Sequence, residues 1–406
     1  MLVESAHFRT TERPLCSTRL ESQSYVLSIV SLPGQYAASA SAPTNSIAIF
    51  DKATLRRVDS LPGHDVATTS LHAVQGIVGG GTTLMSSGRD GSVKIWDPRS
   101  RSHSIKMTNS SATRALLCCD VSNDANTIAA GTDMQGDDAL IFYWDPRKPA
   151  APLRTHSSTH SDDITTLAFA RAPPPPGADA PRNTILSASS DGLVSTSNAD
   201  EDDEDEAVCH VANWGCSVSQ AGWIDTPGAA AGVWAASDME TFSTWSHELD
   251  PRQSLDIRSP VLHGRRTWVT DYLITCAPHV PHAPDTLGVF TGSNEGDIAL
   301  LSSADLGSPT APWHIHATWT TGHVGVVRAL LWDHQVLLLF LVLRRPFMTD
   351  ARPQNNVLVT GGEDAKLHVW PGLVPADDEM EVDGAAPRKR SLELEELEQE
   401  GKRARR

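Results

Sequence analysis

The sequence predicts an all-β protein built from seven similar units of four strands each, and three observations support this prediction. The stretch from Ser86 to Asp97 contains a strand end, a tight Asp90-Gly91 turn and a second strand with alternating apolar residues. Asp and Gly tolerate the positive φ angles that such a turn needs. Related stretches recur along nearly the whole chain, and 406 residues are enough for one large all-β domain of this kind.

The repeated unit runs from a Gly-His pair to a Trp-Asp pair. Gly63-His64 precede Trp96-Asp97, and Gly322-His323 precede Trp370 in a second full copy. Five copies are less complete, and one of them keeps the Asp191-Gly192 turn but has Ser197 in the Trp position. The seven anchor positions in this series are Phe50, Trp96, Trp144, Ser197, Trp245, Leu301 and Trp370. A unit of this period with these end residues is typical of one blade of a β-propeller.

These repeats resemble the WD-repeat family over nearly the whole chain except its tail. Within the family, residues 137–140, 160–165, 189–194 and 361–365 resemble the group called WD repeat-containing protein 89. The resemblance implies a seven-bladed propeller in which Asp, His, Ser or Thr and the Trp indole are hydrogen-bonded in series. The positions carried over are His64, Ser86, Asp90 and Trp96; His323, Thr360, Asp364 and Trp370; and, without the Trp, His160, Ser187 and Asp191.

A Ser, His and Asp trio also invites a hydrolase interpretation. The trio recurs in more than one blade, which a single catalytic site would not do, and no GxSxG loop accompanies it. We therefore favour a structural network, because buried polar groups must be paired and then fix the packing around them. The sequence predicts no catalytic residue, no metal site and no cofactor, and thus a protein that is not an enzyme.

Composition limits the partners that we expect. The net charge is −17 and the pI is about 5.3, which argues against a surface that binds nucleic acid directly. The apolar run at 336–343 is far shorter than the roughly 20 residues of a membrane-spanning helix. Residues 1–5 show no basic-then-apolar signal region, and the six cysteines form no CxxC pair. We expect a soluble intracellular protein with reduced thiols, no membrane contact and a monomeric propeller.

Three segments are predicted along the chain. Residues 1–19 form an N-terminal segment, of which 7–19 should supply the closing strand of the last blade, since no strand follows Trp370. Residues 20–372 form the propeller. Residues 336–354 lengthen its last unit, and their removal leaves a natural strand, turn and strand. Because codons for Val336 and Gln354 allow a GT start and an AG end, we hypothesise a translated, unspliced intron.

The segment 373–406 is predicted to be a disordered charged tail. Two basic clusters, separated by eleven residues, have the size and separation of a bipartite nuclear import signal. We therefore expect a nuclear protein that is also present in the cytoplasm; the alternative is a merely solvated tail. The cluster residues are Arg388, Lys389, Arg390, Lys402, Arg403, Arg405 and Arg406.

Two further features suggest partners. The acidic run Asp200–Glu206 is interpreted as a disordered connector, with the binding of a basic protein such as a histone tail as the alternative. Two Trp-Asp-Pro-Arg motifs, at 96–99 and 144–147, resemble the motif by which some WD-repeat proteins dock on the adaptor of cullin-4 ubiquitin ligases. Turn chemistry after a strand is the alternative. The candidate docking residues are Asp97, Arg99, Asp145 and Arg147.

These observations favour a non-enzymatic scaffold that binds other proteins on a propeller face, because a propeller carries no chemistry of its own. We expect it to act in the nucleus. Two other functions are kept open. One is a substrate receptor of a cullin-4 ubiquitin ligase. The other is a chromatin or ribosome-assembly factor.

Overall fold

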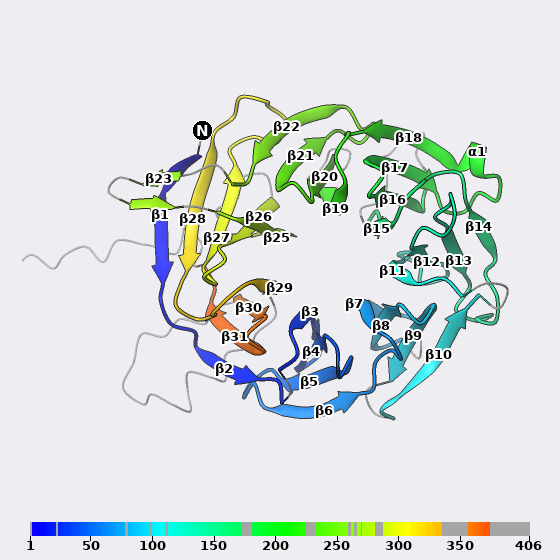
Figure 1. The fold of residues 1–406 in the computed structure, drawn as a ribbon, viewed down its shortest axis with the longest axis horizontal. Helices are drawn as coiled ribbons and strands as arrows, with labels where there is room; N and C mark the ends of the chain where they lie inside the picture. Colours follow the sequence, from blue (N-terminus) through cyan, green and yellow to red (C-terminus); the bar gives the residue numbers. More distant parts are fainter. Residues whose placement is uncertain are drawn as a thin grey trace, which may run out of the picture. The chain divides into compact units, whose positions relative to one another are not determined.

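The computed structural model describes residues 2–21, 23–77, 80–97, 100–109, 113–171, 181–224, 232–258, 261–263, 266–268, 270–280, 287–334 and 356–373. The chain divides into two compact units, Met1–Leu373 and Val374–Arg406. All described residues belong to the first unit, which forms a ring of seven sheets, six with four strands and one with five (Figure 1). The predicted all-β, seven-bladed propeller is confirmed.

Each blade contains four antiparallel strands, counted here from the inner strand outward, and they are consecutive in the chain in every blade except blade seven. Blade one holds β3 (Val26–Leu32), β4 (Gln35–Ala40), β5 (Ile47–Asp51) and β6 (Arg57–Leu61). Blade two holds β7 (Thr68–Gln75), β8 (Thr82–Gly88), β9 (Ser92–Asp97) and β10 (Ser102–Thr108). Blade three holds β11 (Leu116–Val121), β12 (Ile128–Thr132), β13 (Ile141–Trp144) and β14 (Arg154–His156).

The remaining blades follow the same order. Blade four holds β15 (Ile164–Phe169), β16 (Thr184–Ser189), β17 (Leu193–Asn198) and β18 (Val208–Asn213). Blade five holds β19 (Val218–Ile224), β20 (Gly232–Ser237), β21 (Thr241–Trp245) and β22 (Pro251–Asp256). Blade six holds β25 (Tyr272–Pro278), β26 (Leu287–Gly292), β27 (Ile298–Ser303) and β28 (Trp313–Trp319), and a small hairpin of β23 (Val261–His263) and β24 (Arg266–Trp268) precedes it. Blade seven holds β29 (Val327–Asp333), β30 (Val357–Gly362), β31 (Lys366–Pro371) and β2 (Cys16–Arg19).

The third strand of every blade carries one of the seven anchor positions. Trp96 in β9 and Trp370 in β31 are buried, and so are Phe50, Trp144 and Trp245 in the equivalent strands. The sequence repeat is offset from the blade, since it begins in the connection before the inner strand and ends at the third strand. Each fourth strand therefore follows the Trp position of its own repeat.

The core is divided among the seven interfaces between neighbouring blades. One apolar cluster lies at each interface, and each anchor packs toward the preceding blade, as Trp96 does against Leu61 of blade one. The cluster between blades seven and one joins Val359 and Leu367 to Phe50 and thereby closes the ring. Since burial stabilises by about 25 cal/mol per Å² of apolar area, every interface contributes to holding the ring together.

Residues 2–19 contribute two strands to two different blades. Strand β2 pairs antiparallel with β31, from Cys16 opposite Val369 to Arg19 opposite Lys366, and completes blade seven. Upstream, β1 (Leu2–Thr11) pairs in parallel with β28 and adds a fifth strand to blade six. The predicted closing strand within residues 7–19 is confirmed by β2, which occupies the last part of this range, whereas residues 7–11 belong to β1 on the neighbouring blade.

The acidic run is ordered rather than a disordered connector, which corrects the prediction. Residues Glu204–Ala207 form helix α1, which is capped by Asp203 and is the only helix among the residues that the structure describes. Opposite charges outside the run offset its self-repulsion, since the guanidinium of Arg154 lies 2.7 Å from a carboxylate oxygen of Asp202. Within the described part, no helix is both long and apolar enough to cross a membrane.

Several predictions lie outside the described residues. These are the suspected intron at 336–354, the tail beyond Leu373 with its basic clusters at 388–390 and 402–406, and Arg99. At the borders of the suspected intron, β29 and β30 pair directly, with Asp333 opposite Val357. The strands that flank the segment, β29 before it and β30 after it, thus form one antiparallel pair.

Candidate functional site

Every inner strand has a β-bulge near its start, at the second residue in six blades and at the third residue, Ile274, in β25 of blade six. The register of β7 shifts between Thr68 and Ser70, and that of β29 shifts between Val327 and Ala329. Bulges re-aim a side chain out of the regular ladder. The seven bulged residues are Leu27, Thr69, Leu117, Thr165, Ser219, Ile274 and Arg328.

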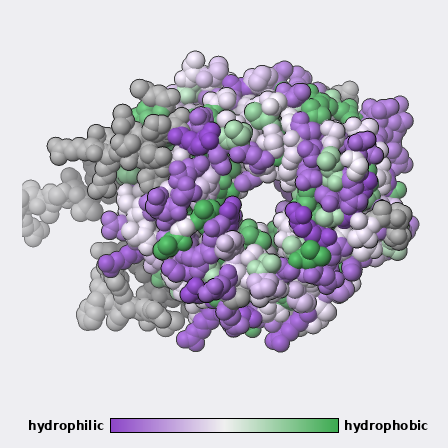
Figure 2. Space-filling model, in the orientation of Figure 1, coloured by the Kyte–Doolittle hydropathy of each residue, from purple (hydrophilic) through white to green (hydrophobic). Residues whose placement is uncertain are grey.

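Six of the seven bulged residues, all except Ser219, line a central cavity of about 400 Å³. Figure 2 shows an opening through the middle of the ring, with hydrophobic patches beside it and hydrophilic residues over much of the surrounding surface. We call the side of the ring that carries the bulges the bulge face and the opposite side the far face. Because strands alternate in direction, the bulge face also carries the turns between the second and third strands.

Exposed apolar side chains gather on the bulge face. Val66 and Val324, each just before an inner strand, are 56% and 74% exposed. Met134 and Met239, each between a second and a third strand, are 44% and 61% exposed. Tyr25, directly before β3, is 43% exposed. Apolar side chains grouped in this way around an opening are typical of a protein-binding surface.

The same face is strongly acidic. Among the described residues of its connections, acidic side chains far outnumber basic ones: Asp65, Asp133, Asp137, Asp138, Asp162, Asp163, Asp238, Glu240, Asp271, Glu295 and Glu363 stand against Arg89, Arg114 and Arg258. The bulged Arg328 is neutralised, because its Nε and Nη2 atoms lie 2.9 and 2.7 Å from Glu363 Oε1. Burial raises the pKa of Glu240, whose carboxylate accepts a hydrogen bond from Leu273 N.

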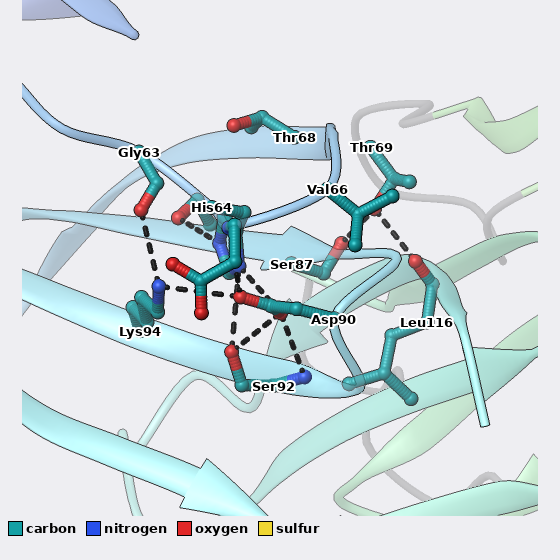
Figure 3. Close-up of polar contacts among 12 residues, drawn as sticks. Gly63, His64, Val66, Thr68, Thr69, Ser87, Asp90, Ser92, Lys94 and Leu116 are labelled. Atoms are coloured by element: carbon teal, nitrogen blue, oxygen red, sulfur yellow. Dashed lines mark hydrogen bonds and ion pairs between the residues drawn. The ribbon is translucent and has the colours of Figure 1, made fainter. Parts of the chain in front are cut away.

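Blade two contains a complete hydrogen-bonded series on the bulge face, and Figure 3 shows the part of it around His64 and Asp90. His64 Nδ1 lies 2.9 Å from Asp90 Oδ1, and His64 Nε2 lies 2.8 Å from Ser86 Oγ. Trp96 Nε1 donates to Ser86 Oγ over 2.8 Å. Ser86 is fully buried and its hydroxyl is engaged on both sides, so it is not placed to attack a substrate. The series fixes the connection before β7 to the turn before β9.

Lys94 extends this network. Its Nζ lies 3.3 Å from Asp90 Oδ2 and donates to Gly63 O over 3.1 Å, and the side chain is buried. Burial on its own would raise the pKa of Asp90, but hydrogen bonds from His64 and Ser92 outweigh it and the pKa is far below its usual value. Asp90 is therefore a carboxylate held among several donors.

Blade seven repeats the series with Thr360 in place of the serine. His323 lies 3.1 Å from Asp364 and 2.8 Å from Thr360 Oγ1, and Trp370 Nε1 donates to that hydroxyl over 2.9 Å. His368 occupies the place of Lys94, and its nitrogens contact Ser17 Oγ and Gly322 O.

The residues His323, Asp364 and His368 lie close enough together to be considered as a metal site. Both ring nitrogens of each histidine already have a hydrogen-bond partner within the protein. A metal ion would have to replace these contacts. The donor set therefore does not fit a metal centre.

Blade four holds a shortened series. His160 lies 3.3 Å from Asp191 Oδ2 and 2.8 Å from Ser187 Oγ. Ser197 takes the place of the tryptophan and is buried, so no indole reaches Ser187.

The motif residues proposed for adaptor docking lie on the far face. Arg147 Nε lies 2.9 Å from Asp145 Oδ1, and another guanidinium nitrogen lies 3.0 Å from Asn126 Oδ1. The hydrogen bond from Arg147 lowers the pKa of Asp145. Asp97 ends β9, and its partner in the motif, Arg99, is not among the described residues.

Sequence reasoning missed the bulge face itself. A signal was present, since each bulged residue directly follows the first apolar or β-branched residue of its inner strand, as Thr69 follows Thr68 and Arg328 follows Val327. The exposed Met134 and Met239 also stand in turns where polar residues are usual.

Comparisons with known proteins agree with this architecture. A family described as "WD domain, G-beta repeat" matches residues 55–97. An uncharacterized WD repeat-containing protein of Saccharomyces cerevisiae is 27% identical over 265 residues, which are 64% of this chain and 61% of that protein. The chain thus spans less than two thirds of that relative.

Two further matches cover more of the chain. The WD repeat-containing protein 89 homolog of Dictyostelium discoideum is 22% identical over 85% of this chain and 82% of its own length. A chain in the crystal structure of a mitotic checkpoint complex superposes with a TM-score of 0.61 at 13% identity, covering 91% of this chain and 94% of that one. The first match confirms the predicted resemblance to that group, and the second shows the fold.

Proposed function

Because the chain is a WD-repeat β-propeller, we propose that it is a non-enzymatic scaffold whose partner protein binds the bulge face. WD-repeat propellers are generally protein-interaction scaffolds. The observation that carries the proposal is the combination of exposed apolar side chains with an excess of carboxylates around the central opening. A complementary partner segment would be basic and would carry apolar side chains that contact Met134, Met239 or Val324.

Blade five offers a matched test of this proposal. Asp238 and Met239 are adjacent, exposed and on the bulge face, whereas His247 and Glu248 are adjacent, exposed and on the far face. Replacing either pair by two lysines changes the local charge by the same amount. We expect partners found by quantitative affinity purification and mass spectrometry to be lost with the Asp238→Lys, Met239→Lys variant and kept with the His247→Lys, Glu248→Lys variant. Equal partner sets for both variants would contradict the proposal.

A second candidate is a substrate receptor of a cullin-4 ubiquitin ligase. Supporting it, Asp145 holds Arg147 in a defined orientation at the far face while the Arg147 side chain stays 70% exposed. The double variant Arg99→Ala, Arg147→Ala should then lose a cullin-4 adaptor from the purified partners while the bulge-face variant keeps it. Retention of the adaptor by the double variant would exclude docking through these motifs.

We also propose a nuclear location, on the strength of the two basic clusters at 388–390 and 402–406. A chromatin or ribosome-assembly role is the third candidate, and it would make a basic protein the partner. Changing the lysines and arginines of both clusters to alanine should move a fluorescent fusion of the full chain from nucleus to cytoplasm. An unchanged distribution would remove the argument for import.

A further inference from the structure

The connection between β14 and β15 surrounds a carboxylate with backbone donors. Glu204 of α1 accepts hydrogen bonds from three consecutive backbone N–H groups: from Ser157 over 2.8 Å, from Ser158 over 2.6 Å and from Thr159 over 3.2 Å. The Thr159 hydroxyl donates to the same carboxylate over 3.2 Å. Consecutive N–H groups that converge on one anion form a nest, an arrangement that also binds phosphate.

Side chains from blade three extend the nest. The guanidinium of Arg154 lies over the Tyr143 ring at 5.3 Å, and the His156 ring lies 5.0 Å from the same ring. Arg154 Nη1 contacts Asp200 O and Asp202 Oδ1, so part of its donor capacity is directed to the acidic run. His156 directly precedes Ser157 in the chain. Burial is the main cause that shifts the pKa of Tyr143 upward and that of His156 downward, and the charge on Glu204 raises both.

Three polar atoms of this cluster have no hydrogen-bond partner. They are Tyr143 OH, His156 Nε2 and Arg154 Nε, and all three are buried. Tyr143 is 0% exposed and His156 is 2% exposed. Buried polar groups without a partner are rare in folded proteins because they lower stability, so three in one cluster need an explanation. The cluster holds more hydrogen-bonding groups than one carboxylate uses.

We propose that residues 157–159 with Arg154, His156 and Tyr143 form a binding site for a phosphate monoester, and that Glu204 occupies it as an internal substitute. A phosphate group has three terminal oxygens against two in a carboxylate, so it can use the backbone nest and the unpartnered side chains together. The site lies at the outer edge of blades three and four, where α1 is drawn (Figure 1).

Glu204 is suited to leave the nest. It belongs to a helix of four residues, which has little stability of its own. Its neighbour Asp202 is 86% exposed in the side chain, so the run is held mainly by Arg154 and by the nest. When a phosphate takes over these contacts, the acidic run is released from the outer wall of blade three.

The test removes the internal carboxylate. The full chain is prepared as wild type, as Glu204→Ala and as Glu206→Ala, a control that removes an exposed carboxylate two residues away. Calorimetric titration uses inorganic phosphate and O-phosphoserine at constant ionic strength. Because an internal ligand competes at an effective concentration in the millimolar range or above, phosphate should bind Glu204→Ala at least about tenfold more tightly than wild type. Glu206→Ala should behave as wild type.

Further variants keep the test decisive. Glu204→Gln retains the side-chain size and should also tighten phosphate binding, which covers the case that Glu204→Ala folds poorly. Adding Arg154→Gln to either variant should abolish the gain. Tighter binding of O-phosphoserine would assign the ligand to a phosphorylated side chain, and tighter binding of inorganic phosphate would assign it to the free ion. Equal affinities for Glu204→Ala, Glu204→Gln and Glu206→Ala would overturn the proposal.

Discussion

Blades two and four share a histidine, a serine and an aspartate in the same three places, yet they differ in what these residues support. In blade two the series continues to Trp96 and to Lys94, whose equivalents in blade four are Ser197 and Ser195. The His160 to Asp191 contact, at 3.3 Å, is also longer than the His64 to Asp90 contact, at 2.9 Å.

The comparison separates two roles that the repeat combines. The His and Asp pair holds the connection before the inner strand to the turn before the third strand, and blade four keeps this role without an indole. The indole of Trp96 fills the interface between blade two and blade one. Blade four has no such indole, and its interface with blade three is filled by Phe169 and by Tyr143 of blade three. The hydrogen-bonded series and the packing of the anchor are therefore independent requirements.

The largest difference in stability between variants of blade two and blade four should follow from replacing the anchor residues by alanine. Trp96→Ala removes a fully buried indole from the interface with blade one and should lower the free energy of unfolding by about 3–5 kcal/mol. Ser197→Ala removes only a hydroxyl and should cost less than about 1 kcal/mol. Urea unfolding followed by tryptophan fluorescence and circular dichroism measures both. Similar losses for the two variants would contradict the separation of roles.

A smaller difference should follow from removing the central hydroxyl. Ser86→Ala leaves both His64 and Trp96 with a buried atom unpaired, whereas Ser187→Ala affects only His160. Each buried group left without a partner costs about 1–3 kcal/mol. The free energy of unfolding should therefore fall further in Ser86→Ala than in Ser187→Ala, by about the cost of one such group. Ser86→Thr is the control, since Thr360 fills this place in blade seven, and it should be nearly neutral.

The smallest effect should be a change in how the free energy of unfolding depends on pH. The pKa of Asp90 is lowered in the folded protein, because the hydrogen bonds from His64 and Ser92 outweigh the effect of burial. Its stabilising contribution is therefore complete above the unfolded pKa, about 3.9, and is lost as the pH falls below that value. Asp90→Asn should flatten the decline of unfolding free energy between about pH 4 and 2 by at most about 1.4 kcal/mol per pH unit.

Asp191→Asn is the partner measurement in blade four. The pKa of Asp191 is also lowered, with burial again outweighed by hydrogen bonds from His160 and from two backbone groups. The same flattening is expected for this variant, reduced because no lysine lies beside Asp191. A steeper decline with pH in either variant than in wild type would show that the sign is wrong.

Local signals in the sequence were sufficient to predict the ring of seven blades and the place of each repeat in it. The Asp90-Gly91 turn, with Gly91 at φ +72, and the seven anchors fix the second and third strands of each blade. The ordering of the acidic run could not be predicted, because it depends on Arg154 and on backbone groups of residues 157–159 in another blade. The same reason hid β1, whose partner β28 lies some 300 residues away in the chain, as the contact between Thr10 and Thr318 shows.

The bulge face was hidden for a different reason. A bulge is a property of a pair of strands, so the position of Thr69 or Arg328 after the first apolar or β-branched residue becomes informative only when the inner strands are compared with one another. The exposure of Met134 and Met239 likewise follows from where the turns project and not from their composition. Function on this fold therefore depends on positions that become recognisable only once the seven inner strands are aligned.

The strand that completes blade seven also sets an order of events during protein synthesis. Ser17 Oγ contacts His368 Nδ1 over 2.7 Å, and 351 residues separate the two. At about 5–20 residues per second on the ribosome, β2 waits on the order of tens of seconds after its own synthesis before β31 exists. Throughout that time β2 lacks its partner strand β31, so residues 16–19 must not pair with another sheet edge.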